Sequence, residues 1–165
     1  MTMTHFASFV PADVGTAVPF KFYDHLPAIR GFIDDMPARF DIDSGSRSEI
    51  DITSPFVAKM GLRDRYQPGI SAITGWGVGG ASRSYVVRVP SITLGSVKVP
   101  RIVAALSESK AGSFSDPNYE ANIGSGLLKR LVVSFDYSRK TMYLKPLDPP
   151  PPDAGAFDRS GMWIN

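Results

Sequence analysis

Residues 39–46 constrain the fold of this chain more than any other stretch of the sequence. Phe40 and Ile42 alternate with polar residues, which is the period-two pattern of a strand with one buried face. The three residues that follow Ile42 are an acid, a hydroxyl residue and a glycine: Asp43, Ser44 and Gly45. Because Asp and Ser favour turns and glycine lacks the restriction that a β-carbon imposes, we predict a strand that ends in a sharp turn presenting the Asp43 carboxylate.

Further strands are predicted on both sides of this turn. Apolar alternation or short apolar runs indicate strands at 17–23, 26–33, 48–52, 85–90, 91–95, 97–106, 131–137 and 141–145. A tight turn at 34–37 joins the second of these strands to the strand that delivers Asp43. Residues 107–118 are polar and rich in Ser and Gly, and they predict a long surface loop.

A short helix is predicted at 54–62. Ser54 is suited to the N-cap, Pro55 to the first helical position, and Gly61 to the left-handed position that ends a helix. A second short helix is predicted at 125–130, directly before the strand at 131–137.

Residues 75–80, Gly-Trp-Gly-Val-Gly-Gly, lie between two strand patterns within 70–88 and predict a hairpin. Glycine tolerates positive φ angles and weakens local packing, so we expect the tip of this hairpin to be mobile. An ordinary hairpin loop and a segment that folds over a ligand both fit this composition, and Trp76 fits either a ligand contact or a partly buried packing position. A dinucleotide site does not fit, because the glycines do not lie between a strand and a helix.

Five elements in a fixed order resemble the retropepsin-like aspartic proteases. They are a hairpin, the Asp43-Ser44-Gly45 turn, a helix that ends in Gly61-Leu62, a glycine-rich hairpin, and the Ile123-Gly124 pair followed by a helix and a strand. The resemblance spans residues 18–146 and implies an all-β fold, the closed barrel of the acid proteases with a flap hairpin and one or two short helices. Two departures are Asn122, where the family usually has an apolar residue, and the length of the loop at 107–118.

The resemblance also implies roles for individual residues. It makes Asp43 the catalytic acid, Ser44 the residue whose hydroxyl braces the turn, and Gly45 the residue that lets the loop approach its counterpart. The flap that closes over bound peptide would be formed by Trp76, Gly77, Val78, Gly79 and Gly80. Ile123 and Gly124 would support the turn, because a strand can cross under it only where it lacks a side chain.

Peptide hydrolysis of this type requires two carboxylates on either side of one water molecule. The sequence holds one such turn, since Asp41 lies within a strand and Asp136 precedes a different turn. We therefore expect half of an aspartic endopeptidase site, which a C2 homodimer or a second retropepsin-like domain completes and which cleaves a peptide or protein substrate. The alternative is a catalytically silent module of the same fold that binds a peptide or acts as a scaffold, because a fold does not establish an activity.

Composition argues against several other classes of function. The 165 residues carry a formal charge of +2 and scattered basic side chains, so nucleic acid is not an expected partner. The chain has no cysteine, and neither His5 nor His25 has metal-ligand spacing, so we expect no metal. No cofactor is expected, because the nucleophile would be water.

The sequence also lacks the signals of a membrane span and of a serine hydrolase. No apolar run reaches the roughly 18–20 residues of a membrane-spanning helix. The G-x-S-x-G motif of serine hydrolases is absent.

The sequence is expected to divide into three parts. Residues 1–16 would be an N-terminal extension, 17–146 the retropepsin-like domain, and 147–165 a stiff proline-rich linker with the truncated start of a following domain. Residues 161–164 resemble the segment that leads into the PDZ domain of bacterial proteins that pair the two domains. The resemblance also suggests an exported, periplasmic protein, while the sequence itself leaves the compartment open.

Overall fold

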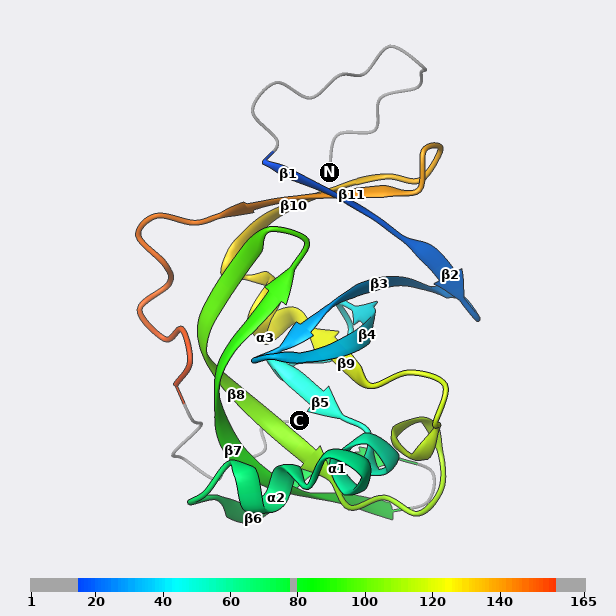
Figure 1. The fold of residues 1–165 in the computed structure, drawn as a ribbon, viewed down its shortest axis with the longest axis vertical. Coiled ribbons are helices and arrows are strands. Elements are labelled where there is room, and N and C mark those ends of the chain that lie inside the picture. Colours follow the sequence, from blue (N-terminus) through cyan, green and yellow to red (C-terminus); the bar gives the residue numbers. More distant parts are fainter. Residues whose placement is uncertain (1–14, 78–79, 157–165) are drawn as a thin grey trace.

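The computed structural model describes residues 15–77 and 80–156, most of which form strands (Figure 1). A three-stranded sheet has the order β1-β11-β10, and an eight-stranded sheet has the order β2-β3-β4-β9-β5-β8-β7-β6. The strands are β1 (Thr16–Pro19), β2 (Lys21–Tyr23), β3 (Leu26–Ile33), β4 (Met36–Asp43), β5 (Ile50–Ile52), β6 (Ile70–Gly77), β7 (Gly80–Leu94), β8 (Val97–Ser107), β9 (Ala121–Gly124), β10 (Leu131–Asp136) and β11 (Thr141–Pro146). The helices are α1 (Ser54–Met60), α2 (Leu62–Arg65), the 3-10 helix η1 (Ser113–Ser115) and α3 (Ser125–Leu128). The chain is therefore all-β with short helices, as predicted.

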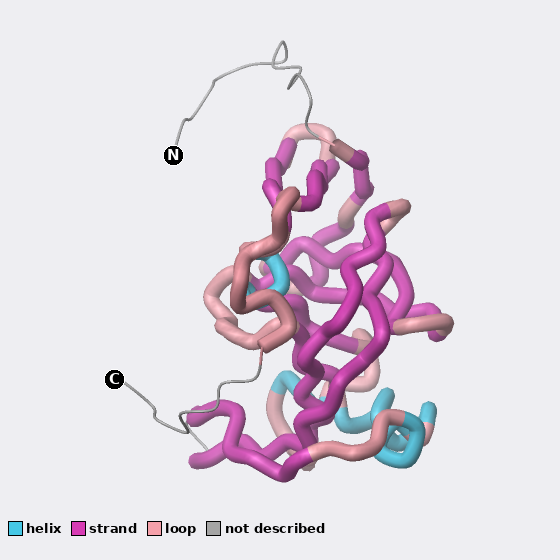
Figure 2. Tube along the Cα trace, turned by 90° about the vertical axis from the view of Figure 1, so that its left-hand side faces the viewer, coloured by secondary structure: helices cyan, strands magenta, loops and turns pink. Residues whose placement is uncertain are grey.

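The larger sheet closes on itself in the described part of the chain. The strands β3-β4-β9-β5-β8-β7 form a ring of pairings, because β3 pairs antiparallel with β7 as well as with β4. Figure 2 shows the strands wrapping around the interior, with the three-stranded sheet at one end of the molecule and the helices α1 and α2 at the other. A closed ring leaves few unpaired strand edges, and this arrangement fits the barrel expected from the sequence.

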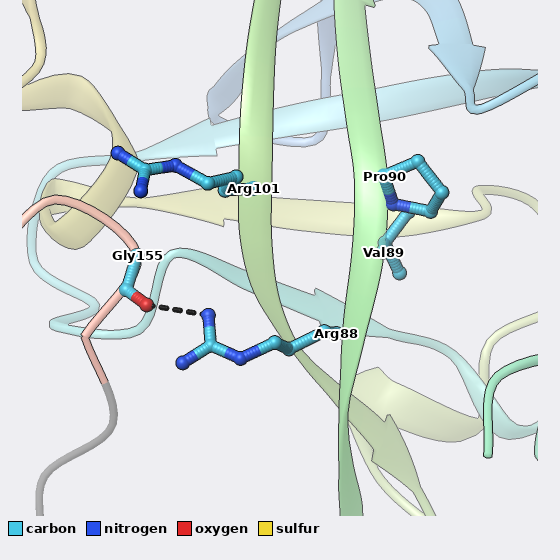
Figure 3. A pocket seen from close by; sticks show the side chains of 5 residues that line it. All are labelled: Arg88, Val89, Pro90, Arg101 and Gly155. Carbon is cyan, nitrogen blue, oxygen red and sulfur yellow. Dashed lines mark hydrogen bonds between the residues drawn. The ribbon is translucent and has the colours of Figure 1, made fainter. Parts of the chain in front are cut away.

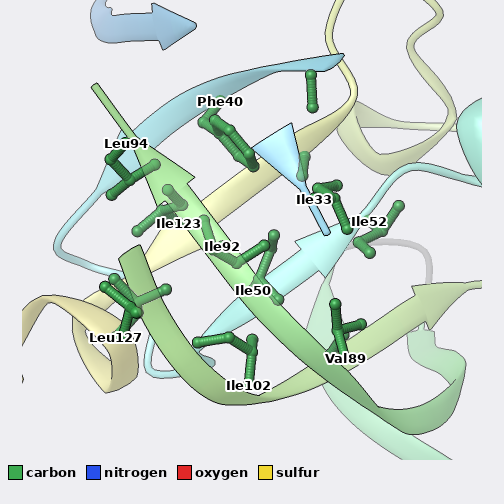
Figure 4. Close-up of a cluster of buried hydrophobic side chains, with 14 of the residues drawn as sticks. Ile33, Phe40, Ile50, Ile52, Val89, Ile92, Leu94, Ile102, Ile123 and Leu127 are labelled. Carbon is green, nitrogen blue, oxygen red and sulfur yellow. The ribbon is translucent and has the colours of Figure 1, made fainter. Parts of the chain in front are cut away.

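Apolar side chains fill the interior of this ring (Figure 4). Phe40 and Ile42 of β4 are both buried in this core. Because side chains alternate along a strand, Asp41 and Asp43 lie on the other face of β4. Complete burial of a side chain such as Phe40 stabilises the fold by about 1.5–3 kcal/mol, so the core determines which face of β4 carries the acidic residues.

The helix predicted at 54–62 is present as α1, but its N-cap is Thr53 and not Ser54. The Ser54 hydroxyl donates instead to a backbone carbonyl oxygen of Ser109, at 2.6 Å. Pro55 consequently occupies the second helical position, where its missing N–H removes no intrahelical hydrogen bond. The assignment of the cap to Ser54 was therefore wrong by one residue, because a contact 55 positions away in the sequence engages its hydroxyl.

Gly61 ends α1 with a φ of 60°, as predicted, and α2 begins at the next residue. Together with α3, the described residues contain three short α-helices, where the sequence predicts one or two. The difference is α2, which has four residues and is too short to show a helical period in the sequence. η1 lies within the loop predicted at 107–118.

β7 is one continuous strand of 15 residues, whereas the sequence predicts separate strands at 85–90 and 91–95. The register with β8 is the same on both sides of Pro90, since Val89 lies opposite Ile102 and Ser91 opposite Pro100. A proline interrupts a strand where its missing N–H is needed for the ladder. Here the pairing resumes at the next residue, so the strand continues past Pro90.

The described part of the proline-rich segment turns back onto the domain. Arg88 of β7 donates from Nη1 to the carbonyl oxygen of Gly155 at 2.7 Å, beside a hollow that Val89, Pro90 and Arg101 also line (Figure 3). The Gly155 N–H donates to Oε1 of Glu49 at 3.0 Å. Residues 147–156 therefore do not form a free spacer. The domain predicted to follow them lies outside the described residues.

Candidate functional site

Asp43 is the last residue of β4 and lies opposite Gly124, the last residue of β9, in a parallel pairing. A β-carbon on Gly124 would lie 2.3 Å from the carbonyl oxygen of Ser48 and 2.8 Å from that of Ser46. Carbon and oxygen atoms cannot approach so closely without a shift of the backbone. Glycine at position 124 therefore lets the loop that follows Asp43 pass across the end of β9.

The Asp43 carboxylate is held by its own turn. Its Oδ1 accepts a hydrogen bond from the Gly45 N–H at 2.9 Å, and the Asp43 carbonyl oxygen accepts one from the Ser46 N–H at 3.1 Å. A carboxylate that bonds the backbone two residues further on is typical of an Asx turn. Asp43 is half-buried, so its carboxylate is both oriented and accessible to water.

Three serines that the sequence analysis does not single out brace the loop after Asp43. The Ser125 N–H and hydroxyl both donate to the carbonyl oxygen of Ser46, each at 2.7 Å. The hydroxyl oxygens of Ser46 and Ser48 are 2.8 Å apart. Ser44, which the resemblance assigns to bracing, is exposed, and its hydroxyl makes no hydrogen bond with the described residues of this chain. The period-two spacing of Ser46 and Ser48 is the signal that could have identified them.

Asp51 of β5 is a buried carboxylate next to this loop. The Ser48 hydroxyl donates to Asp51 Oδ2, and the Ser46 hydroxyl donates to the same oxygen at 3.4 Å. Burial raises the pKa of the Asp51 carboxyl, the two serine hydroxyls oppose that rise, and the negative charge of Asp43 adds to it. Asp51 therefore joins the loop after Asp43 to the barrel.

A polar row lies beside the Asp43–Gly124 pair on the same face of the sheet. Asn122 of β9 lies opposite Asp41 of β4 on one side and opposite Asp51 of β5 on the other, and all three residues are buried. Burial raises the pKa of Asp41 to about 6, although the positive charge of Arg39 opposes that rise. The sequence places Asp41 within the strand and on the same strand face as Asp43, and the pairing with β9 agrees with that placement.

The glycine-rich hairpin is present, and its pairing extends to Gly77 opposite Gly80. Val78 and Gly79 lie outside the described residues. Trp76 is 66% exposed, so it is not a packing residue of the core. Within the described ranges, no hydrogen bond or strand pairing joins this hairpin tip to the Asp43 turn. The structure thus brings Asp43 and Gly45 together with Ile123 and Gly124, and presents the hairpin as a separate element.

Among residues 15–77 and 80–156, no three His, Asp or Glu side chains are grouped so that they could hold a metal ion. Over those ranges, no helix combines the length and the apolar character needed to cross a membrane.

No protein-family model and no curated protein sequence matches this chain. A solved structure of a retropepsin-like aspartic protease from Rickettsia conorii matches it with a TM-score of 0.53 and 17% identity, over 78% of this chain and 88% of that one. The retroviral protease-like domain of Ddi1 from Leishmania major matches with a TM-score of 0.47 and 16% identity, over 73% of this chain and 94% of that one. At such identities the likeness to the first structure shows the fold alone.

The chain therefore has the retropepsin-like fold. Its sequence carries one Asp-Ser-Gly turn, formed by Asp43, Ser44 and Gly45, and this turn lies beside Ile123 and Gly124.

Proposed function

We propose that this chain supplies one half of an aspartic endopeptidase site, with Asp43 as one of its two catalytic carboxylates. The observation that supports this proposal is the pairing of Asp43 with Gly124, which presents an oriented, half-buried carboxylate at the end of two parallel strands. Gly45 would let the turn approach the second half of the site. The hairpin residues Trp76 to Gly80 would cover the bound peptide, which lies along them as an added strand.

The chemistry needs two such carboxylates that share one proton, because two close negative charges cannot both be ionised at low cost. The ionised carboxylate takes a proton from the water that attacks the scissile carbonyl carbon, and the protonated carboxylate donates to the carbonyl oxygen. The C–N bond of the tetrahedral intermediate then breaks: the amine nitrogen takes the proton that the first carboxylate removed from water, and one hydroxyl of the intermediate returns a proton to the second carboxylate as the product acid forms. This chain would contribute one carboxylate, that of Asp43, to this exchange.

The second carboxylate would come from a second copy of the chain, related by a twofold axis, or from another retropepsin-like domain. Ser44 is suited to a contact across that boundary, because its hydroxyl is exposed and has no hydrogen bond within the described residues of its own chain. Ser44 would then brace the turn of the opposite half.

The activity is tested by Asp43→Asn in the full-length protein, with Asp136→Asn as a matched control, since Asp136 also accepts hydrogen bonds from its own turn. We expect Asp43→Asn to lower the rate of peptide cleavage at acidic pH on the order of a thousandfold, and Asp136→Asn to leave it nearly unchanged. Pepstatin should inhibit the unmodified protein. Full activity of an Asp43→Ala variant would instead indicate a catalytically silent module.

Mixing experiments identify the source of the second carboxylate. If two copies form the site, an equal mixture of exchanged wild-type and Asp43→Asn chains should retain about a quarter of the activity of the same amount of wild-type protein. The reason is that about a quarter of the dimers are wild type in both copies, while the shared site of every mixed dimer lacks one carboxylate. If the second carboxylate belongs to the same polypeptide, the mixture should retain about half.

We also propose that the segment after residue 156 leads into a PDZ domain. The support is the sequence of residues 161–164, Gly-Met-Trp-Ile. A longer polypeptide should then bind peptides through their free C-terminal carboxylate, and amidation of the peptide should abolish binding.

A further inference from the structure

Glu49 ends the loop that follows Asp43 and directly precedes β5. Its side chain is 9% exposed, and three distant segments donate hydrogen bonds to it. Oε2 accepts from the Val103 N–H of β8 at 2.6 Å. Oε1 accepts from Nη1 of Arg130 at 3.2 Å and from the Gly155 N–H at 3.0 Å. Glu49 therefore attaches the end of this loop to β8, to the residue before β10 and to the C-terminal segment at 147–156.

The backbone of the loop joins Glu49 to the Asp43 turn. The carbonyl oxygen of Glu49 accepts a hydrogen bond from the Gly124 N–H at 3.3 Å, and Gly124 is the residue of β9 that lies opposite Asp43. The neighbouring carbonyl oxygen of Ser48 accepts one from the Gly126 N–H at 3.1 Å. A displacement of Glu49 would therefore disturb the hydrogen bonds that hold the loop against the end of β9.

Gly155 is fixed to the domain through both of its backbone polar groups. Its N–H donates to Glu49, and its carbonyl oxygen accepts from Nη1 of Arg88 at 2.7 Å (Figure 3). The residue is buried and has a φ of 67°. A β-carbon at this position would collide with the carbonyl oxygen of Arg101. The segment at 147–156 is thus docked at a site that requires glycine.

The bond from Gly155 is a substantial part of what holds the Glu49 carboxylate. It is the shorter of the two bonds to Oε1, and the Arg130 nitrogen that makes the other one also lies 3.4 Å from the carbonyl oxygen of Arg101. A nearly buried carboxylate that loses a donor must find another partner or turn toward water. Loss of Gly155 from its site would therefore favour a shift of the Glu49 side chain.

We infer that the segment at 147–156 holds the loop after Asp43 in place, with Gly155 and Glu49 as positioning residues of the candidate site. Release of the segment would loosen this loop, and the Asp43 carboxylate would lose part of its fixed orientation. Hydrolysis would then slow, because the catalytic rate depends on small changes in the position of the reacting groups. The catalytic consequence rests on the proposed function and names a form of regulation of that same site.

Amide hydrogen exchange in the full-length protein measures the loop without any need for activity. Gly155→Ala should displace the segment, because the added methyl group meets backbone atoms. We expect the amides of Ser46, Gly124 and Gly126 to exchange about fivefold or more faster than in the wild type. The amides of β3, which pairs with β2, β4 and β7, report global unfolding and should change less.

The matched control for Gly155→Ala is Gly112→Ala. Gly112 also has a positive φ, 80°, but no atom lies within 4 Å of a β-carbon added there. This variant carries the same backbone strain without a collision, so exchange at the three loop amides should stay close to the wild-type rate.

Arg88→Met releases the segment by a second route, because it removes the guanidinium group that bonds the Gly155 carbonyl oxygen. Arg88 is exposed, so its loss should not disturb the core. The same three amides should exchange faster in this variant even if Gly155→Ala fails to fold. Arg83→Met is its control, at another exposed arginine of β7, and should not affect them.

Peptide cleavage by the same full-length variants gives the second measurement. Gly155→Ala and Arg88→Met should each lower kcat about fivefold and leave KM within about twofold, because an oriented acid matters more in the transition state than in substrate binding. The controls Gly112→Ala and Arg83→Met should leave both constants nearly unchanged.

Unchanged exchange at the loop amides in both Gly155→Ala and Arg88→Met would overturn this inference and leave the proposed function intact. So would an increase that is equal in the loop and in β3, or a rise in KM at constant kcat. If the wild type cleaves no peptide, the proposed function fails. The regulatory role of the segment then fails with it, even where the loop amides respond.

Discussion

Asp43 and Gly124 lie opposite each other at the ends of two parallel strands, and the space where a β-carbon of Gly124 would lie is filled by the backbone of the loop that follows Asp43. The carbonyl oxygens of Ser46 and Ser48 occupy that space. The position of the acidic turn therefore depends on Gly124, which lies 81 positions later in the chain. The residues of the turn alone do not determine it.

Gly124→Ala should destabilise the protein by about 1–3 kcal/mol, because the added methyl group meets backbone atoms that cannot rotate away. The control is Gly75→Ala, where the nearest atom to the added carbon is 3.8 Å away, an ordinary contact. Urea denaturation of both variants measures the difference. Equal losses of stability would show that the loop can move away from β9.

Asp41→Asn should change the pH dependence of stability. The pKa of Asp41 is raised from 3.8 to about 6, so between these pH values the folded protein binds the proton more tightly than the unfolded chain. The contribution of Asp41 to the stability of the wild type should therefore fall as the pH rises from about 4 to 6. The variant lacks this ionisation, and its stability relative to the wild type should increase by about 1–2 kcal/mol over that range.

The measurement for Asp41 is urea denaturation of both proteins at pH 3.5 and at pH 7. Asp51, whose pKa is also raised by burial, is present in both proteins, so its contribution cancels. A stability difference that is the same at both pH values would show that Asp41 titrates alike in the folded and unfolded states.

Glu49→Gln should destabilise the protein by about 3 kcal/mol or more, because it leaves the buried Arg130 guanidinium without its counter-charge. Glu49 and Arg130 are 3.2 Å apart, with side chains 9% and 4% exposed. Glu108→Gln is the matched control, since Glu108 pairs with Arg63 at the surface at 2.7 Å. The Glu108→Gln variant should lose at most about 1 kcal/mol of stability. Similar losses of stability in the two variants would argue against a special role for the buried pair.

Gly155→Ala should destabilise the protein and release the segment at 147–156. Gly155 has a φ of 67°, and a β-carbon there would lie 2.3 Å from the carbonyl oxygen of Arg101. Gly112→Ala is the control, because Gly112 also has a positive φ, 80°, but has no atom within 4 Å of the added carbon.

The Gly155→Ala and Gly112→Ala variants both place an alanine at a positive φ angle, which costs about 1 kcal/mol of stability in each. Thermal unfolding should therefore show a larger loss for Gly155→Ala, and limited proteolysis should cut its C-terminal segment faster. If both variants lose the same stability and are cut alike, the docking of Gly155 does not contribute to the fold.

Much of the fold could be predicted because its signals are local. The alternation around Phe40 and Ile42 identifies a strand, and Gly61 ends α1 with the left-handed φ that glycine favours. The prediction of two strands around Pro90 was wrong because the sequence does not show that β8 pairs with the residues on both sides of it. The N-cap was misassigned for a similar reason, since the partner of the Ser54 hydroxyl is in a distant loop.

By itself the sequence determined the turn at Asp43, the order of the elements and the resemblance to an aspartic protease, because periodicity and turn chemistry act over a few neighbouring residues. The tertiary structure alone decided that Ser125 braces Ser46 across 79 positions and that Gly155 bonds Glu49 across 106. It also decided that Asp41 Oδ1 and the Nε and Nη2 atoms of Arg39 are buried without hydrogen-bond partners. Which atoms are buried and which find hydrogen-bond partners depends on the distant strands that pack together. Those contacts form only when the whole chain has folded.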